Sequence, residues 1–200
     1  MKPSLLIKSK RGNLTEREHY GFIAVVDCNE AVLSFAGDFK TPFFLRSCAK
    51  PFQAVPIITS NTYNYFNFTL EELAVCCASH AGSFKHTKTV KNILKKIGLN
   101  ENNLKCGIHP PLDKNTQNYL IKNNLNPCVL HNNCSGKHAG MLAVCVNNNW
   151  NIENYLDFNH PLQKEIEKTV KNYCKLDKIS EISRDGCSAP IYGMPLYKMA

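Results

Sequence analysis

The spacing of hydrophobic and polar positions changes along the chain, predicting strands first and helices later. Residues 20–27 are continuously apolar and rich in β-branched side chains. After a short polar turn, residues 31–35 repeat this pattern, so the two runs predict a β-hairpin. We expect a shorter first strand at 4–7, followed by a turn at 11–13. Residues 41–45 are again apolar and predict an extended segment.

Beyond residue 46 the pattern is typical of helices. Thr69 and Glu72 form a capping box ahead of residues 73–78, which are apolar all round and predict a buried helix. Residues 86–97 present lysines on one face, and Gly98 is placed to end that helix. Further helices are expected at 100–104, 113–122 and 161–174, and residues 193–200 predict the beginning of an apolar helix.

A serine and a lysine stand three residues apart at the start of a short helical run. Residues i and i+3 of a helix lie on one face, so the Lys50 amine is expected to reach Ser47 and accept its proton. Free backbone N–H groups at the helix start could hold an oxyanion. With 11 serines and 20 lysines in 200 residues, however, about one such match is expected by chance. The alternative is a solvated lysine on an ordinary helix.

Composition and charge narrow the class of protein. Hydrophobic residues make up 44% of the chain and charged residues 20%, typical of a globular α/β or α+β domain. The net charge of +8 comes from 20 scattered lysines and only four arginines, which does not favour nucleic-acid binding. Ten cysteines without a C-x-x-C pair, and no apolar run of signal-peptide or membrane-spanning length, predict a cytoplasmic protein.

Two loops late in the chain gather reactive side chains. The loop that begins at residue 131 runs into a helix of small residues, and the loop at 184–190 carries a carboxylate, a thiol and a hydroxyl. Cys134 and Cys187 could bind a soft divalent metal such as zinc. The side chains that could help them are Lys137, His138 and His131. The alternative, two buried free cysteines, is favoured at roughly three to one by residue statistics.

The predicted helix at 73–78 delivers two further polar residues to a turn that contains glycine. Ser79 and His80 could contribute to a site there. Taken alone, they are better explained as a core hydroxyl and a surface histidine. Glu16 and His19, ahead of the first long apolar run, are interpreted as surface or turn residues.

Five blocks of sequence together resemble the L-asparaginase II family, whose fold is similar to that of the serine β-lactamases and glutaminases. The resemblance spans essentially all 200 residues, and its last two blocks are the most specific. The matching residues are Arg11-Gly12 with Glu16, His19 and Gly21; Arg46-Ser47 with Lys50-Pro51 and Gln53; Cys77-Ala78-Ser79-His80 with Gly82 and His86; Asn133-Cys134-Ser135-Gly136-Lys137-His138; and Asp185-Gly186-Cys187-Ser188-Ala189-Pro190.

The resemblance implies a single domain over residues 1–200, with a β-lactamase-like antiparallel sheet flanked by helices in an α/β (α+β) fold. It also implies hydrolysis of the side-chain amide of L-asparagine to L-aspartate and ammonia. The metal in this family is understood to support substrate binding rather than to generate hydroxide. Carried over to this sequence, the catalytic residues are Ser47, Lys50 and Ser79, the zinc ligands are Cys134, Lys137 and Cys187, and the substrate-pocket residues are Arg46, His138 and Asp185.

The chain also departs from the family in its length. Family members are longer, and the lysine that partners their second serine, like another active-site cysteine, lies in a C-terminal part that this sequence does not contain. The domain is therefore expected to be incomplete at its C-terminal end, and to act as a homodimer or after completion by a C-terminal chain. Two alternatives stay open: a non-catalytic remnant or subunit that retains zinc, and a glutaminase or β-lactam-reactive hydrolase of the same fold.

Overall fold

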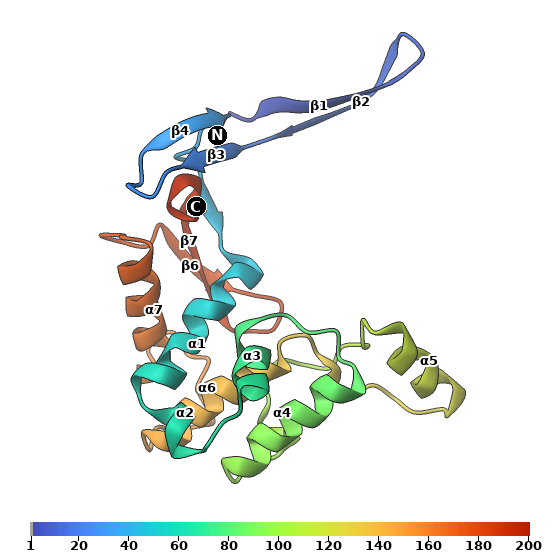
Figure 1. Ribbon diagram of the computed structural model, residues 1–200, viewed down its shortest axis with the longest axis vertical. Helices are drawn as coiled ribbons and strands as arrows, with labels where there is room; N and C mark the ends of the chain where they lie inside the picture. The colour runs from blue at the N-terminus through green and yellow to red at the C-terminus, as the bar shows by residue number, and fades with distance from the viewer. Residues whose placement is uncertain (1) are drawn as a thin grey trace.

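A helical body and a two-stranded arm make up residues 2–200, the part of the chain that the computed structural model describes (Figure 1). Short 3-10 turns connect several of the longer elements. The α-helices are α1 (Lys50–Thr59), α2 (Thr62–Tyr65), α3 (Leu70–Cys77), α4 (Phe84–Lys96), α5 (Lys114–Lys122), α6 (Ser135–Asn147) and α7 (Pro161–Tyr173). The 3-10 turns are η1 (Arg46–Ala49), η2 (Glu101–Asn103), η3 (Val129–His131) and η4 (Leu196–Lys198).

The strands form three small antiparallel sheets. In the first two, β1 (Ser4–Arg11) pairs with β2 (Leu14–Gly21), and β3 (Ile23–Val26) pairs with β4 (Val32–Ala36). The third sheet has the order β5-β7-β6, with β5 at Pro42–Phe44, β6 at Glu181–Arg184 and β7 at Pro190–Pro195. Antiparallel sheets flanked by helices confirm the expected mixed α/β class. A β-lactamase-like identity stays a prediction.

The arm, β1 and β2, differs from the expected first strand and turn. The turn is where it was predicted, and Gly12 adopts a φ of +59° there, a conformation that favours glycine. The strands on either side are longer than expected, however, and the run at 20–27 divides between β2 and β3 at Phe22. Glu16 and His19 lie exposed on β2, where Glu16 pairs with Arg11 at 2.7 Å.

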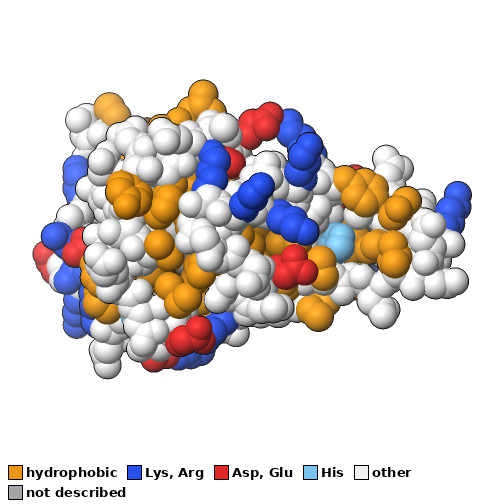
Figure 2. All heavy atoms as spheres, turned by 90° about the horizontal axis from the view of Figure 1, so that it is seen from below, with side chains coloured by type: hydrophobic (Ala, Val, Ile, Leu, Met, Phe, Trp, Pro, Cys, Tyr) orange, Lys and Arg blue, Asp and Glu red, His pale blue; other side chains and the backbone are white. Residues whose placement is uncertain are grey.

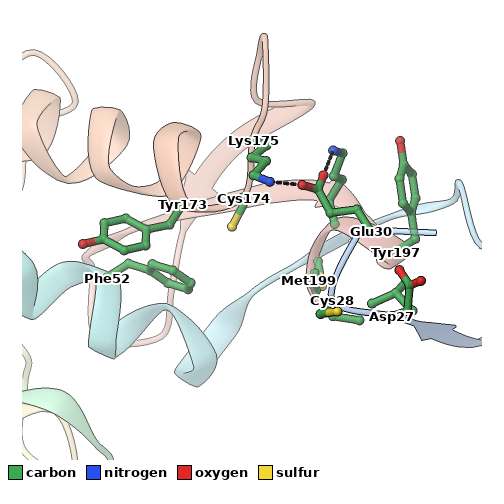
Figure 3. A pocket seen from close by; sticks show the side chains of 12 residues that line it. Asp27, Cys28, Glu30, Phe52, Tyr173, Cys174, Lys175, Tyr197 and Met199 are labelled. Atoms are coloured by element: carbon green, nitrogen blue, oxygen red, sulfur yellow. Dashed lines mark hydrogen bonds and ion pairs between the residues drawn. The ribbon is translucent and has the colours of Figure 1, made fainter. Parts of the chain in front are cut away.

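An ion-pair cluster joins the hairpin of β3 and β4 to the rest of the body. Glu30, in the turn between β3 and β4, pairs with Lys175 and, at 3.3 Å, with Lys198 (Figure 3). Beside the cluster is a cavity of about 340 Å³, into which the aromatic rings of Phe52 and Tyr173 project. Its lining includes none of the expected catalytic, substrate or zinc-binding residues.

Helix α6 forms the centre of the core, as its small residues predict. Every residue from Ser135 to Cys145 is buried, and the helix packs against α1, α3 and α4. Close approach requires glycine at two positions. A Cβ atom at Gly136 would lie 2.3 Å from the carbonyl oxygen of Val75, and one at Gly140 would lie 2.9 Å from the sulfur of Cys76.

Two expectations about helices are wrong. The run at 73–78 is not buried all round, because α3 turns only one side towards α6 and leaves Ala74 and Ala78 exposed. Residues 193–200 do not begin an apolar helix. Gly193 lies in β7, between Phe44 of β5 and Glu181 of β6, and only the short turn η4 follows. Pairing on both sides of β7 satisfies the backbone there, so the extended form is favoured.

The other expected helices are confirmed. Helices α4, α5 and α7 coincide with the predicted segments within a few residues, and the segment at 100–104 is the short turn η2. Seen from the end opposite the arm, exposed hydrophobic side chains lie in patches among the charged ones, including the region around α5 (Figure 2). Within residues 2–200, the helices are too short or too polar to cross a bilayer.

Candidate active site

The sequence-predicted site residues converge from five separate segments. Turn η1 supplies Arg46 and Ser47, the first residue of α1 is Lys50, and Ser79 follows α3. The start of α6 and the turn between β6 and β7 supply the remaining side chains. Those from the α6 region are Cys134, Lys137 and His138, and those from the β6–β7 turn are Asp185 and Cys187.

The backbone around Ser47 is held by the third sheet. Leu45, just ahead of the turn, donates its N–H to the carbonyl of Tyr192 in β7 at 3.1 Å. Arg46, the first residue of η1, adopts a φ of +50°, in the left-handed region. Ser47 is exposed, whereas Lys50, the first residue of α1, is buried in the body.

The two polar groups of the Ser-x-x-Lys motif are connected through a third residue. Lys50 is only 1% exposed, and its Nζ lies 2.7 Å from Ser79 Oγ and 3.2 Å from the Asn133 carbonyl oxygen. Ser79 Oγ lies 3.4 Å from Ser47 Oγ. Burial lowers the pKa of Lys50, and the charge of Lys137 acts in the same direction. The arrangement therefore provides a path for a proton between Ser47 and Lys50.

His80 fixes the position of Ser79, a role that the sequence did not reveal. Its backbone N–H donates to the Asn133 carbonyl at 3.3 Å. Its Nδ1 accepts the N–H of Gly82 at 3.2 Å, and its Nε2 lies 3.0 Å from Ser135 Oγ and 3.4 Å from the backbone nitrogen of Gly136. His80 is 6% exposed, so the expectation of a surface histidine is wrong. Burial lowers its pKa to about 4.

A cavity of about 280 Å³ lies beside Ser79, between α3 and α4. Its walls include Ala78, His80 and His86, whose ring stacks on that of His80 with 5.1 Å between centroids. The exposed side of α3 that the sequence did not predict therefore forms part of this hollow.

The two cysteines of the predicted metal site do meet, together with Lys137. All three are at least 94% buried, at exposures of 6% for Cys134, 4% for Cys187 and 3% for Lys137. Lys137 Nζ lies 3.0 Å from Cys187 Sγ. The neighbouring thiol of Cys187 raises the pKa of Cys134, and the same interaction lowers the pKa of Cys187.

The chemistry of this donor set fits zinc, which prefers thiolate and nitrogen ligands. Within residues 2–200, however, no three histidine, cysteine, aspartate or glutamate side chains are grouped so that they could hold a metal. A metal at Cys134 and Cys187 would therefore need the amine of Lys137 as a ligand. His131, another suggested helper, has its Nδ1 occupied by the backbone N–H of Cys128 at 3.0 Å.

The expected substrate-pocket residues occupy two different environments. Arg46 is exposed and pairs with the largely buried carboxylate of Asp185 at 3.1 Å. Asp185 also accepts the N–H of Gly186 at 2.8 Å. His138, in contrast, is fully buried, with its Nδ1 2.6 Å from the hydroxyl of Tyr155.

A buried lysine amine thus contacts one of two neighbouring serine hydroxyls, close to the ion pair of Arg46 and Asp185. The sequence model of the family described as L-asparaginase II matches residues 7–200. The chain therefore belongs to the L-asparaginase II family, and this membership suggests an amidohydrolase of the asparaginase type. No curated protein matches the sequence.

Proposed function

We propose that the protein hydrolyses the side-chain amide of L-asparagine to L-aspartate and ammonia, with Ser47 as the nucleophile. The observation that carries the proposal is the contact series from Lys50 to Ser79 and on to Ser47, at 2.7 Å and 3.4 Å. An exposed hydroxyl at one end and a buried amine at the other match the needs of a nucleophile and its base.

In the first step, the neutral amine of Lys50 accepts the proton of Ser47 through the hydroxyl of Ser79. The oxygen of Ser47 forms a bond to the amide carbon, and the protonated Lys50 returns its proton to the amide nitrogen through the same path. The C–N bond then breaks, ammonia leaves, and an ester to Ser47 is left. Water then passes a proton through Ser79 to Lys50 and attacks the ester carbon. As the bond to the Ser47 oxygen breaks, Lys50 returns this proton to that oxygen, which gives aspartate and the free serine.

The ion pair of Arg46 and Asp185 supplies charges that match the backbone groups of an amino acid. In the proposed complex the guanidinium binds the α-carboxylate and the Asp185 carboxylate binds the α-ammonium group. Zinc, held by Cys134, Lys137 and Cys187, would add a fixed positive charge that supports substrate binding. All proton transfers in the proposed reaction belong to Lys50 and the two serines.

Ammonia release from the purified chain tests the proposal, with L-asparagine and L-glutamine as parallel substrates. We expect ammonia release with asparagine. In Ser47→Ala the rate of this release should fall by about 10³-fold or more, because the nucleophile is removed. In Ser79→Ala, which interrupts the proton path, the rate of ammonia release should fall by a smaller factor of about 10². Ser34→Ala, an exposed serine on β4, is the matched control.

Mass spectrometry of acid-quenched reactions identifies the acylated residue. We expect the aspartyl ester on the peptide that contains Ser47. An ester on Ser79 would reverse the two serine roles, while preference for glutamine or labelling by penicillin would point to the alternative hydrolases. If the chain releases no ammonia but binds zinc, the non-catalytic alternative is favoured and the proposed activity is wrong.

A further inference from the structure

A thiol and an imidazole meet at turn η3, outside the residues of the proposed reaction. Cys128 directly precedes the turn, and His131 is its last residue. Side chains three residues apart eclipse each other across a 3-10 turn, so these two project to the same side. The Sγ atom of Cys128 lies 3.3 Å from Nδ1 of His131, within hydrogen-bond reach. Both residues are half-buried, and Cys128 is a free cysteine.

The backbone determines which form of the imidazole faces the thiol. The N–H group of Cys128 lies 3.0 Å from the same Nδ1 atom, and a backbone N–H can only donate. Nδ1 of His131 is therefore an acceptor, with its lone pair directed at Cys128. Burial lowers the pKa of His131, which also favours the neutral ring. The thiol thus faces a base that is able to accept its proton.

The pair is separate from the predicted zinc ligands. Among residues 2–200, the hydrogen-bond contacts of the His131 ring are both to Cys128. Lys137, in contrast, contacts the sulfur of Cys187. The imidazole is therefore available to Cys128 whether or not a metal is bound.

Cys128 is also open to a small reagent. It lines a hollow of about 360 Å³, whose other walls include Leu104, Ile108 and Pro127. Glu101 is the charged side chain of this lining. A thiol attacks a disulfide only after it has lost its proton and only where the reagent can approach it. The imidazole meets the first need and the hollow meets the second.

Two other cysteines have the access without the base. Cys28 and Cys48 are exposed, and within residues 2–200 neither thiol makes a hydrogen bond to a histidine, as Cys128 does. Exposure alone would make these two the most reactive thiols of the chain. They therefore allow the effect of the imidazole to be separated from that of exposure within one molecule.

We propose that Cys128 is a site of modification by low-molecular-weight disulfides, with His131 as the base that activates its thiol. Nδ1 of His131 accepts the thiol proton as the Cys128 sulfur attacks one sulfur of the reagent. A new S–S bond forms to Cys128, the S–S bond of the reagent breaks, and His131 passes the proton to the departing thiolate. The products are a mixed disulfide and a free thiol. The modification is independent of the proposed asparaginase activity, because neither residue takes part in it.

Competition among the cysteines of the wild type tests the proposal. The protein is treated with limiting cystamine, a disulfide whose two positive amines suit the charge of Glu101, and the mixed disulfides are mapped by mass spectrometry of unreduced peptides. We expect Cys128 to be modified about tenfold faster than Cys28 and Cys48, although it is less exposed. Modification of Cys128 at an equal or lower rate overturns the proposal.

His131→Gln removes the base and keeps a polar side chain. We expect the rate at Cys128 to fall to that of the exposed cysteines or below, and the rates at the exposed cysteines to stay unchanged. His19→Gln, on the exposed arm, is the matched control and should leave every rate as in the wild type. Cys76, which is 1% exposed, should stay unmodified in a folded variant. An unchanged rate at Cys128 in folded His131→Gln overturns the proposal, and if this variant does not fold, the comparison within the wild type decides.

Discussion

Ser79 connects two residues that the sequence had already paired. Ser47 and Lys50 have the spacing of a nucleophile and its base, but this spacing occurs about once by chance in such a composition. In the folded chain the amine of Lys50 contacts Ser79, from a different segment, and the link to Ser47 continues from there. A local motif could indicate the participants, but it could not reveal the residue that lies between them.

Replacing Lys50 should separate activity from stability. Lys50→Met keeps the length of the side chain and removes a buried amine, so we expect turnover to fall by about 10²- to 10⁴-fold. The free energy of unfolding should stay equal or increase, because a buried polar group no longer has to be desolvated. Ammonia release and urea denaturation measure the two effects. Lys114→Met, at an exposed position, is the control, and a strongly destabilised Lys50→Met would contradict this account.

His80 should make the protein less stable in mild acid. Burial lowers its pKa to about 4, with His86 and Lys50 nearby acting in the same direction, whereas an unfolded histidine has a pKa near 6.5. Between these values the unfolded chain binds more protons, so stability is retained above about pH 6.5 and is lost as the pH falls towards 4.

The expected loss from His80 is about 2 kcal/mol in the free energy of unfolding between pH 7 and pH 5. Urea denaturation at the two pH values measures it. His80→Gln, which has no titrating ring, should be less stable at pH 7 and should show a flatter pH dependence than the wild type. An equally steep dependence in the variant would assign the effect to other histidines, such as His131, whose pKa is also lowered by burial.

At the scale of elements, helix ends were predicted well because their signals are local. The capping box of Thr69 and Glu72 is present at the start of α3, and Gly98 ends α4 with a φ of +73°. Strand β2 was missed because charged residues such as Glu16 and Arg17 dominate its sequence and neither face is covered. Alternation of apolar and polar residues predicts a strand only where one face is buried.

The contact between α3 and α6 should tolerate no side chain at Gly136. A methyl group there would lie 2.3 Å from the backbone oxygen of Val75, which cannot move without displacing α3. We expect Gly136→Ala to lower the free energy of unfolding by about 3 kcal/mol or more. Gly186→Ala is the control, since a methyl group meets no atom within 4 Å there and should change stability by at most about 0.5 kcal/mol. Chemical denaturation compares them, and a stable Gly136→Ala would disprove the tight contact.

At the scale of the whole molecule, the site depends on pairings that no local pattern encodes. Strand β5, near the start of the chain, pairs with β7, near residue 195, and this pairing positions the turn that carries Ser47. The blocks of the family resemblance named the candidate site residues without showing their arrangement. The sequence named His80 as a possible contributor but could not show its burial, because its backbone contact with Asn133 joins distant segments.

The arm should open more readily than the body. The strands β1 and β2 are exposed along most of their length and hydrogen-bond mainly to each other, and an isolated two-stranded hairpin has marginal stability. In hydrogen exchange of the chain in solution, we expect amides of the arm to exchange much faster than those of α6. Equal protection would show that another surface covers the arm under the conditions of the measurement.

The left-handed backbone of Arg46 places opposing demands on one position. An arginine with a φ of +50° costs about 1 kcal/mol relative to glycine, yet its guanidinium is the partner of Asp185. Selection for thermal resistance alone would favour glycine or asparagine at this position, whereas selection for turnover would retain arginine. In a library sorted first for resistance to heat and then for ammonia release, residue 46 should therefore change identity between the two rounds.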